Sequence, residues 1–154
     1  AMMVPPFSLP DGSTVSSTKI RELVASGEIG EANRMLGERY SLSGVVVSGK
    51  QLGRTIGFPT ANTVSSNPLK LVPGRGVYVT EVSVLDRQYY GMTNVGDVIE
   101  TNIFDFDESI YGLELRLRFI ARIRDMRAMN GVEELKKQLS LDRSAAREII
   151  SSLI

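Results

Sequence analysis

The sequence contains neither cysteine nor histidine among its 154 residues. Without cysteine the chain can form no disulfide, no thiolate metal site and no cysteine nucleophile. Without histidine it lacks the commonest general base, the Ser-His-Asp triad and nearly every kind of zinc site. Any catalysis must therefore use carboxylates, hydroxyls, amides, lysine, arginine and backbone N–H groups, with or without a bound hard cation.

A net charge and a long apolar run are missing as well. The 18 basic residues balance the 18 acidic ones, so no global charge points to nucleic acid or to an anionic membrane surface. No apolar run approaches the ~20 residues of a membrane span, and no signal peptide is recognisable. We therefore expect a cytoplasmic monomer with no nucleic-acid or membrane partner. Its 42% hydrophobic and 23% charged residues are ordinary for a globular domain.

The order of local patterns predicts two short helices, a run of strands and a final helix. Residues 15–40 carry apolar side chains at helical spacing, with Gly27 and Gly37 as stops. From Ser41 onward, short β-branched and aromatic segments alternate with Gly, Asn and Asp, which is typical of an antiparallel barrel. Residues 130–154 return to helical spacing.

The clearest strand signal is a strict alternation late in the chain. The apolar members are Leu113, Leu115, Leu117 and Phe119, and the polar ones are Glu114, Arg116 and Arg118. A period of two predicts a strand with one buried and one wet face.

The stretch from Gly44 to Lys50 reads G-x-x-x-x-G-K, one residue short of a Walker A nucleotide loop. Gln51 stands where that loop needs a Ser or Thr ligand for magnesium. The three valines, residues 45–47, are β-branched and favour a strand over a loop. We interpret the match as accidental.

The segment that follows is better suited to holding a phosphate. Gly49, Gly53 and Gly57 lie four residues apart, together with Lys50 and Arg54. Such a flap can bring backbone N–H groups and two cations onto an anion.

Thr60 and Asn62 follow in the sequence P-T-A-N. If this stretch is extended, the two side chains project to the same side and offer neutral oxygen ligands for phosphate-bound magnesium. A glycine-rich turn with a buried threonine is the alternative.

Glu100 begins another predicted strand and shares a face with Asn102. A carboxylate among apolar neighbours can serve as a general base. A surface charge on an edge strand is the equally open alternative.

Several segments resemble those of riboflavin kinases, and they occur in the same order. They are GKQLGRTIGFPTAN, GRGVYVTEV, NVG, ETNIFDFDESIYG, RFIARIRD and VEELKKQLSLDRSAA. The resemblance covers residues 41 to about 150. The preceding segment, VSSTKIRELVASGEIGEANRMLGERYSLSG, resembles the junction in bacterial bifunctional riboflavin kinase/FMN adenylyltransferases.

This resemblance implies a six-stranded antiparallel Greek-key β-barrel with a C-terminal helix and a short helical N-terminal segment. Residues 1–40 would be the remnant of an FMN adenylyltransferase domain, and residues 41–154 the riboflavin kinase domain. The implied reaction is magnesium-dependent transfer of the ATP γ-phosphate to the riboflavin 5′-hydroxyl, giving FMN and ADP. Phosphoryl transfer of this kind needs positioning and charge neutralisation, which do not require histidine.

The resemblance also implies roles for individual residues. Glu100 would be the catalytic base, and Thr60 and Asn62 would bind both ATP and magnesium. Gly49, Lys50 and Arg54 would belong to the flap over the nucleotide. The flavin would meet Asn102, Arg124, Met126 and Met129.

Three features depart from the family pattern. Only three residues separate Gly96 from Glu100, where the family has a longer loop over the active site. Either the loop is short, or the sequence lacks residues there; we expect the second, because three residues leave little room to turn the chain. Met126 and Met129 stand where the family often has an acid and a phenylalanine.

These departures keep a non-catalytic flavin-binding module open as an alternative function. The third departure is the missing H-x-G-H nucleotide motif, which a chain without histidine cannot contain. FAD synthesis by this chain alone is therefore not expected.

Overall fold

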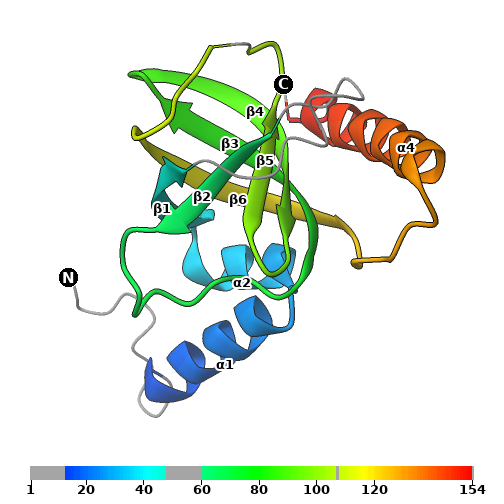
Figure 1. The fold of residues 1–154 in the computed structure, drawn as a ribbon. Coiled ribbons are helices and arrows are strands. Elements are labelled where there is room, and N and C mark those ends of the chain that lie inside the picture. The colour runs from blue at the N-terminus through cyan, green and yellow to red at the C-terminus, as the bar shows by residue number, and fades with distance from the viewer. Residues whose placement is uncertain (1–12, 48–59, 107, 154) are drawn as a thin grey trace.

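The computed structural model describes residues 13–47, 60–106 and 108–153, and its centre is a closed antiparallel barrel (Figure 1). The strands are β1 (Tyr40–Val47), β2 (Ala61–Ser65), β3 (Gly76–Val84), β4 (Arg87–Val95), β5 (Ile99–Ile103) and β6 (Glu114–Arg124). The helices are α1 (Ser13–Ala25), α2 (Ile29–Leu36) and α4 (Val132–Ser151). The predicted six-stranded barrel with a C-terminal helix is confirmed.

The strand order around the barrel is β1-β2-β5-β4-β3-β6. Strands β3, β4 and β5 follow one another as hairpins, and β6 then returns to lie beside β3. Three consecutive strands with a fourth beside the first are a Greek key. The connection thus agrees with the predicted topology.

Strand β6 shows how the sequence pattern becomes the barrel wall. Leu115, Leu117 and Phe119 are at most 1% exposed and fill the interior, whereas Glu114 and Arg116 face solvent. The interior is close-packed: the ring of Phe119 meets that of Tyr78 edge-on, with centroids 5.3 Å apart. One member of the alternation was misjudged. Leu113 precedes β6 and is 39% exposed, because the strand begins one residue later.

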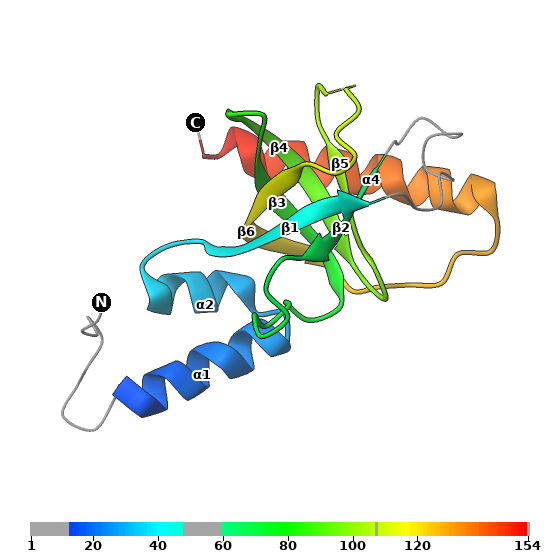
Figure 2. The ribbon, with the colours of Figure 1, turned by 60° about the vertical axis from the view of Figure 1, so that its left-hand side comes forward.

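Helices α1 and α2 lie beneath the barrel and share its core (Figure 2). Val24, Ile29 and Ala32 are fully buried in the same apolar cluster as the interior of the barrel. Asn33 fastens α2 to the wall, because its amide donates to the Phe119 carbonyl at 2.7 Å and accepts from the Tyr40 N–H at 2.7 Å.

Helix α4 lies along the outside of the barrel, against β3, β4 and β6 (Figure 1). A second apolar cluster of Val79, Met92, Phe104 and Ala146 fills the space between them.

The connection between β4 and β5 is a tight turn of residues 96–98. Val95 pairs with Ile99 and Asn94 with Glu100, and the Gly96 N–H donates to the Val98 carbonyl at 3.0 Å. Three residues are therefore enough to reverse the chain and place Glu100 on β5, contrary to the expectation from the sequence.

Candidate active site

The wall formed by β3, β4 and β5 buries a chain of three threonines on its inner face. The Thr93 hydroxyl lies 2.9 Å from those of both Thr80 and Thr101, and all three residues are 0% exposed. Since successive strand residues point to opposite faces, Asn94 and Glu100 belong to the outer face.

On that outer face, Glu100 lies between two asparagines on neighbouring strands. Its Cα partner is Asn62 on β2 and Asn94 on β4. Directly opposed residues have their side chains on the same face, within reach of one another. The structure therefore joins the predicted base, Glu100, with the predicted magnesium ligand, Asn62.

Two oxygens of this outer row are buried acceptors. The Oδ1 atoms of Asn62 and Asn94 are both inaccessible to solvent, and no hydrogen bond reaches either of them within the described residues. A buried acceptor without a donor costs about 1–3 kcal/mol, so such groups are rare unless a ligand completes them. Water, a cation or the hydroxyl of a ligand can complete these two acceptors.

Thr60 lies immediately before β2 and lines a cavity of about 220 Å³. This cavity opens at the end of the barrel where β2 begins, between β5 and the segment leading to β6. The residues that line it are Val46, Thr60, Ala61, Thr101, Ile103, Phe106, Glu108, Ser109, Ile110 and Tyr111. Its walls are mixed apolar and polar, which is typical of a site for a small organic ligand.

A second hollow, of about 440 Å³, lies between the end of β5 and α4. Asn102 lines it, together with Arg143 and Arg147 of α4. Burial, and then the neighbouring Arg147 charge, lowers the pKa of Arg143. Arg147 lies over the Phe104 ring at 4.6 Å and within 4.0 Å of the Asp105 carboxylate.

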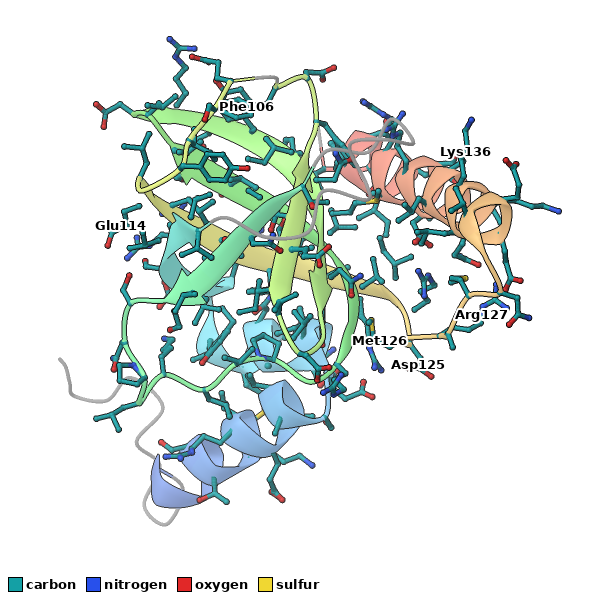
Figure 3. The ribbon with its side chains drawn as sticks, in the orientation of Figure 1. Phe106, Glu114, Asp125, Met126, Arg127 and Lys136 are labelled. Carbon is teal, nitrogen blue, oxygen red and sulfur yellow. The ribbon has the colours of Figure 1, made fainter. Side chains whose placement is uncertain are left out.

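The predicted flavin residues come from β5, from the end of β6 and from the connection between β6 and α4. Asn102 is two residues along β5 from Glu100 and is 6% exposed. Met126 lies on the connection between β6 and α4 (Figure 3). Its side chain lies close to Gly96, since a Cβ atom added to that glycine would be 3.2 Å from the Met126 Cε. Met129 is half-buried on the same connection.

Arg124 is held by α4. Its Nε and Nη2 donate to the two carboxylate oxygens of Asp142, each at 2.8 Å, and Asp142 is 2% exposed. Gln138 donates a further hydrogen bond to Asp142 at 2.9 Å. The Arg124 side chain thus fastens the end of β6 to α4, a role that the sequence pattern did not reveal.

The flap residues Gly49, Lys50 and Arg54 lie outside the described residues. Strand β1 extends through Val47, so the three valines of the Walker-like match are in a strand, as predicted.

Asn94, the Cα partner of Glu100 on β4, was not among the predicted site residues. The signal available was its place in the N-V-G motif, but the motif alone does not say which residue it opposes. Within the part of the chain that the structure describes, no cluster of three or more Asp, Glu, His or Cys could hold a metal. A magnesium ion here would therefore rely on amide, hydroxyl and substrate phosphate oxygens.

Comparison with known proteins identifies the class. A family model described as "Flavokinase: Riboflavin kinase" matches residues 36–150. The chain belongs to this riboflavin kinase family, whose activity forms FMN.

The curated relatives are longer than this chain. It is 37% identical over 151 residues to the bifunctional riboflavin kinase/FMN adenylyltransferase of Bacillus subtilis (strain 168), covering 90% of this chain and 48% of that protein. The protein with the same description from Listeria monocytogenes is 38% identical over 149 residues, with 90% and 47% covered. The chain thus spans about half the length of the curated relatives it matches.

Two solved structures are similar in fold. One, from Streptococcus pneumoniae and described as a macrolide-efflux protein, has a TM-score of 0.84 and 37% identity, covering 95% of this chain and 50% of that one. The other, riboflavin kinase from Trypanosoma brucei, has a TM-score of 0.55 and 20% identity, with 72% and 76% covered. Among the described helices of the present chain, none combines the length and apolar character that crossing a bilayer requires.

Proposed function

We propose that this chain transfers the γ-phosphate of ATP to the riboflavin 5′-hydroxyl with the help of Mg²⁺, giving FMN and ADP. The observation that carries the proposal is the placement of Glu100 between two buried amide oxygens on the outer face of a riboflavin kinase barrel. A carboxylate there can act on a hydroxyl, and the flanking oxygens can hold a cation and a polar substrate.

In this proposal Glu100 is the general base. Its carboxylate takes the proton of the 5′-hydroxyl as that oxygen forms a bond to the γ-phosphorus. The bond from the γ-phosphorus to the β–γ bridging oxygen breaks at the same centre, and its electrons leave with ADP. A positioned base of this kind contributes about 10²–10⁴-fold to the rate.

Asn62 fits the magnesium ion that the family implies. Its Oδ1 is buried and accepts no hydrogen bond within the described residues, and a neutral amide oxygen is a common ligand of hard cations. Thr60, which immediately precedes β2, would supply the second ligand from the protein. The ion, when bound, would neutralise charge on the phosphates, while the barrel wall fixes Asn62 beside Glu100.

The experiment is FMN formation from riboflavin and ATP, resolved by chromatography, with and without Mg²⁺. We expect magnesium-dependent product with the wild type and none with Glu100→Ala. A Mg²⁺ titration of Asn62→Ala should need about 10-fold more metal for half-maximal rate, the equivalent of one lost ligand interaction of ~1.4 kcal/mol. Wild-type protein that forms no FMN would contradict the proposal.

The second candidate is a module that binds flavin without turning it over. The three-residue turn between β4 and β5 favours it, because the turn is too short to fold over Glu100 as the longer family loop would. Riboflavin that binds without consumption of ATP would support this alternative.

We also propose that the chain acts as a monomer in the cytoplasm. The row of Asn62, Glu100 and Asn94 comes from strands of one chain, so no second copy is needed to complete it. Light scattering after size-exclusion chromatography, in the presence of riboflavin, tests the monomer.

A further inference from the structure

The outer face of the barrel carries an ordered row of residues across five strands. From β2 to β6 the row reads Asn62, Glu100, Asn94, Val77 and Arg124, each the Cα partner of the next. Neighbouring strands are about 4.8 Å apart, so the row gives a fixed sequence of chemical groups across the surface. Asn94 is the one polar member that neither the sequence pattern nor the resemblance gave a role.

The two ends of the row differ in what surrounds them. Asn62 lies on β2 and is the last residue of the P-T-A-N segment expected to hold the nucleotide. Asn94 lies on the opposite side of Glu100, next to the turn that Met126 of the β6–α4 connection covers. Glu100 therefore lies between the side of Asn62, where the nucleotide is expected, and the side of Asn94, which borders Met126, a residue expected at the flavin.

The side chain of Asn94 has an unused acceptor. Its Oδ1 is buried and receives no hydrogen bond from the described residues, although the residue is only half-buried as a whole. On the inner face of the same two strands, the neighbouring Thr93 and Thr101 hydroxyls lie 2.9 Å apart and satisfy each other. The fold thus pairs other buried polar groups on these strands, but the Asn94 oxygen has no donor among the described residues.

We propose that Asn94 binds the acceptor substrate, its Oδ1 accepting a hydrogen bond from the 3′- or 4′-hydroxyl of the ribityl chain while the 5′-hydroxyl lies at Glu100. This inference rests on the proposed kinase function and adds a substrate-binding residue to it. Asn94 lies one strand spacing from Glu100. A polyol chain whose 5′-hydroxyl lies at Glu100 therefore passes Asn94. A hydroxyl can donate to this buried oxygen, whereas a phosphate oxygen could only accept, and the magnesium ion is expected on the Asn62 side of Glu100.

The test compares Asn94→Ala with the wild type in two assays. Riboflavin binding is followed without ATP by quenching of flavin fluorescence, and turnover is followed by FMN chromatography. We expect the riboflavin Kd and KM to rise about 10-fold, the loss of one buried hydrogen bond, while the KM for ATP is unchanged. The melting temperature should not fall, because the substitution removes an acceptor that has no partner among the described residues.

Three controls sharpen this result. Asn94→Asp keeps an acceptor oxygen and should bind riboflavin better than Asn94→Ala does. Asn67→Ala removes an exposed asparagine, whose Oδ1 accepts from the Leu69 N–H at 3.0 Å, and should leave riboflavin affinity unchanged. Riboflavin analogues lacking the 3′- or 4′-hydroxyl should bind the wild type more weakly than riboflavin does. The Asn94→Ala variant should bind one of these analogues and riboflavin with equal affinity.

The inference is overturned if Asn94→Ala binds riboflavin like the wild type, if the KM for ATP rises instead, or if both analogues are still discriminated by the variant. A wild type that binds riboflavin but forms no FMN contradicts the proposed kinase alone, and the fluorescence assay still decides on Asn94. A wild type that binds no riboflavin contradicts both.

Discussion

The inner and outer faces of the β4–β5 hairpin both bury polar side chains, but they treat them in opposite ways. On the inner face, Thr93 and Thr101 lie 2.9 Å apart in a completed chain of hydroxyls. On the outer face, one residue away along each strand, Asn94 opposes Glu100 and keeps an acceptor that no described residue satisfies. On these two strands, the inner threonine hydroxyls are paired within the fold, whereas the outer Asn94 oxygen has no partner among the described residues.

The comparison predicts the largest effect for Glu100→Gln. We expect kcat for FMN formation to fall about 10²–10⁴-fold, because a positioned base is lost. The melting temperature should change little, since the carboxamide has nearly the same shape. Glu114→Gln is the matched control: it alters an exposed acid at the start of β6 and should leave kcat intact. Equal loss in both variants would show that Glu100 has no special role.

Asp142→Ala tests whether α4 is held to the barrel through Arg124. Removing one partner of a buried ion pair costs about 3–5 kcal/mol, and Asp142 is 2% exposed, so we expect a large loss in the free energy of unfolding. Urea denaturation measures it. The control is Asp105→Asn, because the Asp105 carboxylate is 84% exposed, 4.0 Å from Arg147, and asparagine tolerates the positive φ of 59° at this position. That exposed pair should contribute about 0–1 kcal/mol. A small effect at Asp142 would contradict its role as the anchor of α4.

Thr93→Val tests the inner face. The variant removes the Thr93 hydroxyl, the central one of the three, so the hydroxyls of Thr80 and Thr101 each lose a hydrogen-bond partner. We expect the free energy of unfolding to fall by about 1–3 kcal/mol. Activity per folded molecule should be retained.

Thr63→Val is its counterpart in the same barrel. The Thr63 hydroxyl is buried and makes no hydrogen bond within the described residues, so its removal should be neutral or stabilising. If both variants lose the same stability, the inner chain of hydroxyls has no special value.

The smallest effect belongs to the rim of the outer face. Arg75 donates a hydrogen bond to Asp97 in the β4–β5 turn, and this bond and the charge of Arg75 hold the pKa of that carboxyl below its ordinary value. A depressed pKa contributes stability at neutral pH that is lost as the pH falls through the folded-state pKa. We expect Arg75→Ala to move the NMR titration midpoint of Asp97 upward. An unchanged midpoint would mean that the pair does not persist in solution.

The strands could be predicted from the sequence because their signal is local. Leu115, Leu117 and Phe119 alternate with polar residues, and that period of two describes one strand without reference to any other. The helix stops at Gly27 and Gly37 are local as well, since both glycines adopt positive φ, of 83° and 77°. The misplacement of Leu113 reflects the uncertainty of a strand's first residue.

The candidate site could be predicted only in part. Glu100 and Asn62 were named through motifs, and they proved to be Cα partners. Arg124 was expected at the flavin, but no local pattern reveals that Asp142, on another element, accepts hydrogen bonds from its Nε and Nη2.

By itself, the sequence determined the barrel class, the family and the identity of the base candidate, because these depend on periodicity and on short motifs. Only the tertiary structure decided that Asn94 lies beside Glu100 and that α4 is fastened through Arg124. Strand register is set by the turns and by closure of the barrel. Helix docking is set by contacts between segments that are distant in the sequence. A shift of one residue in the β4–β5 register would turn Asn94 away from Glu100, and nothing in either strand alone fixes that register.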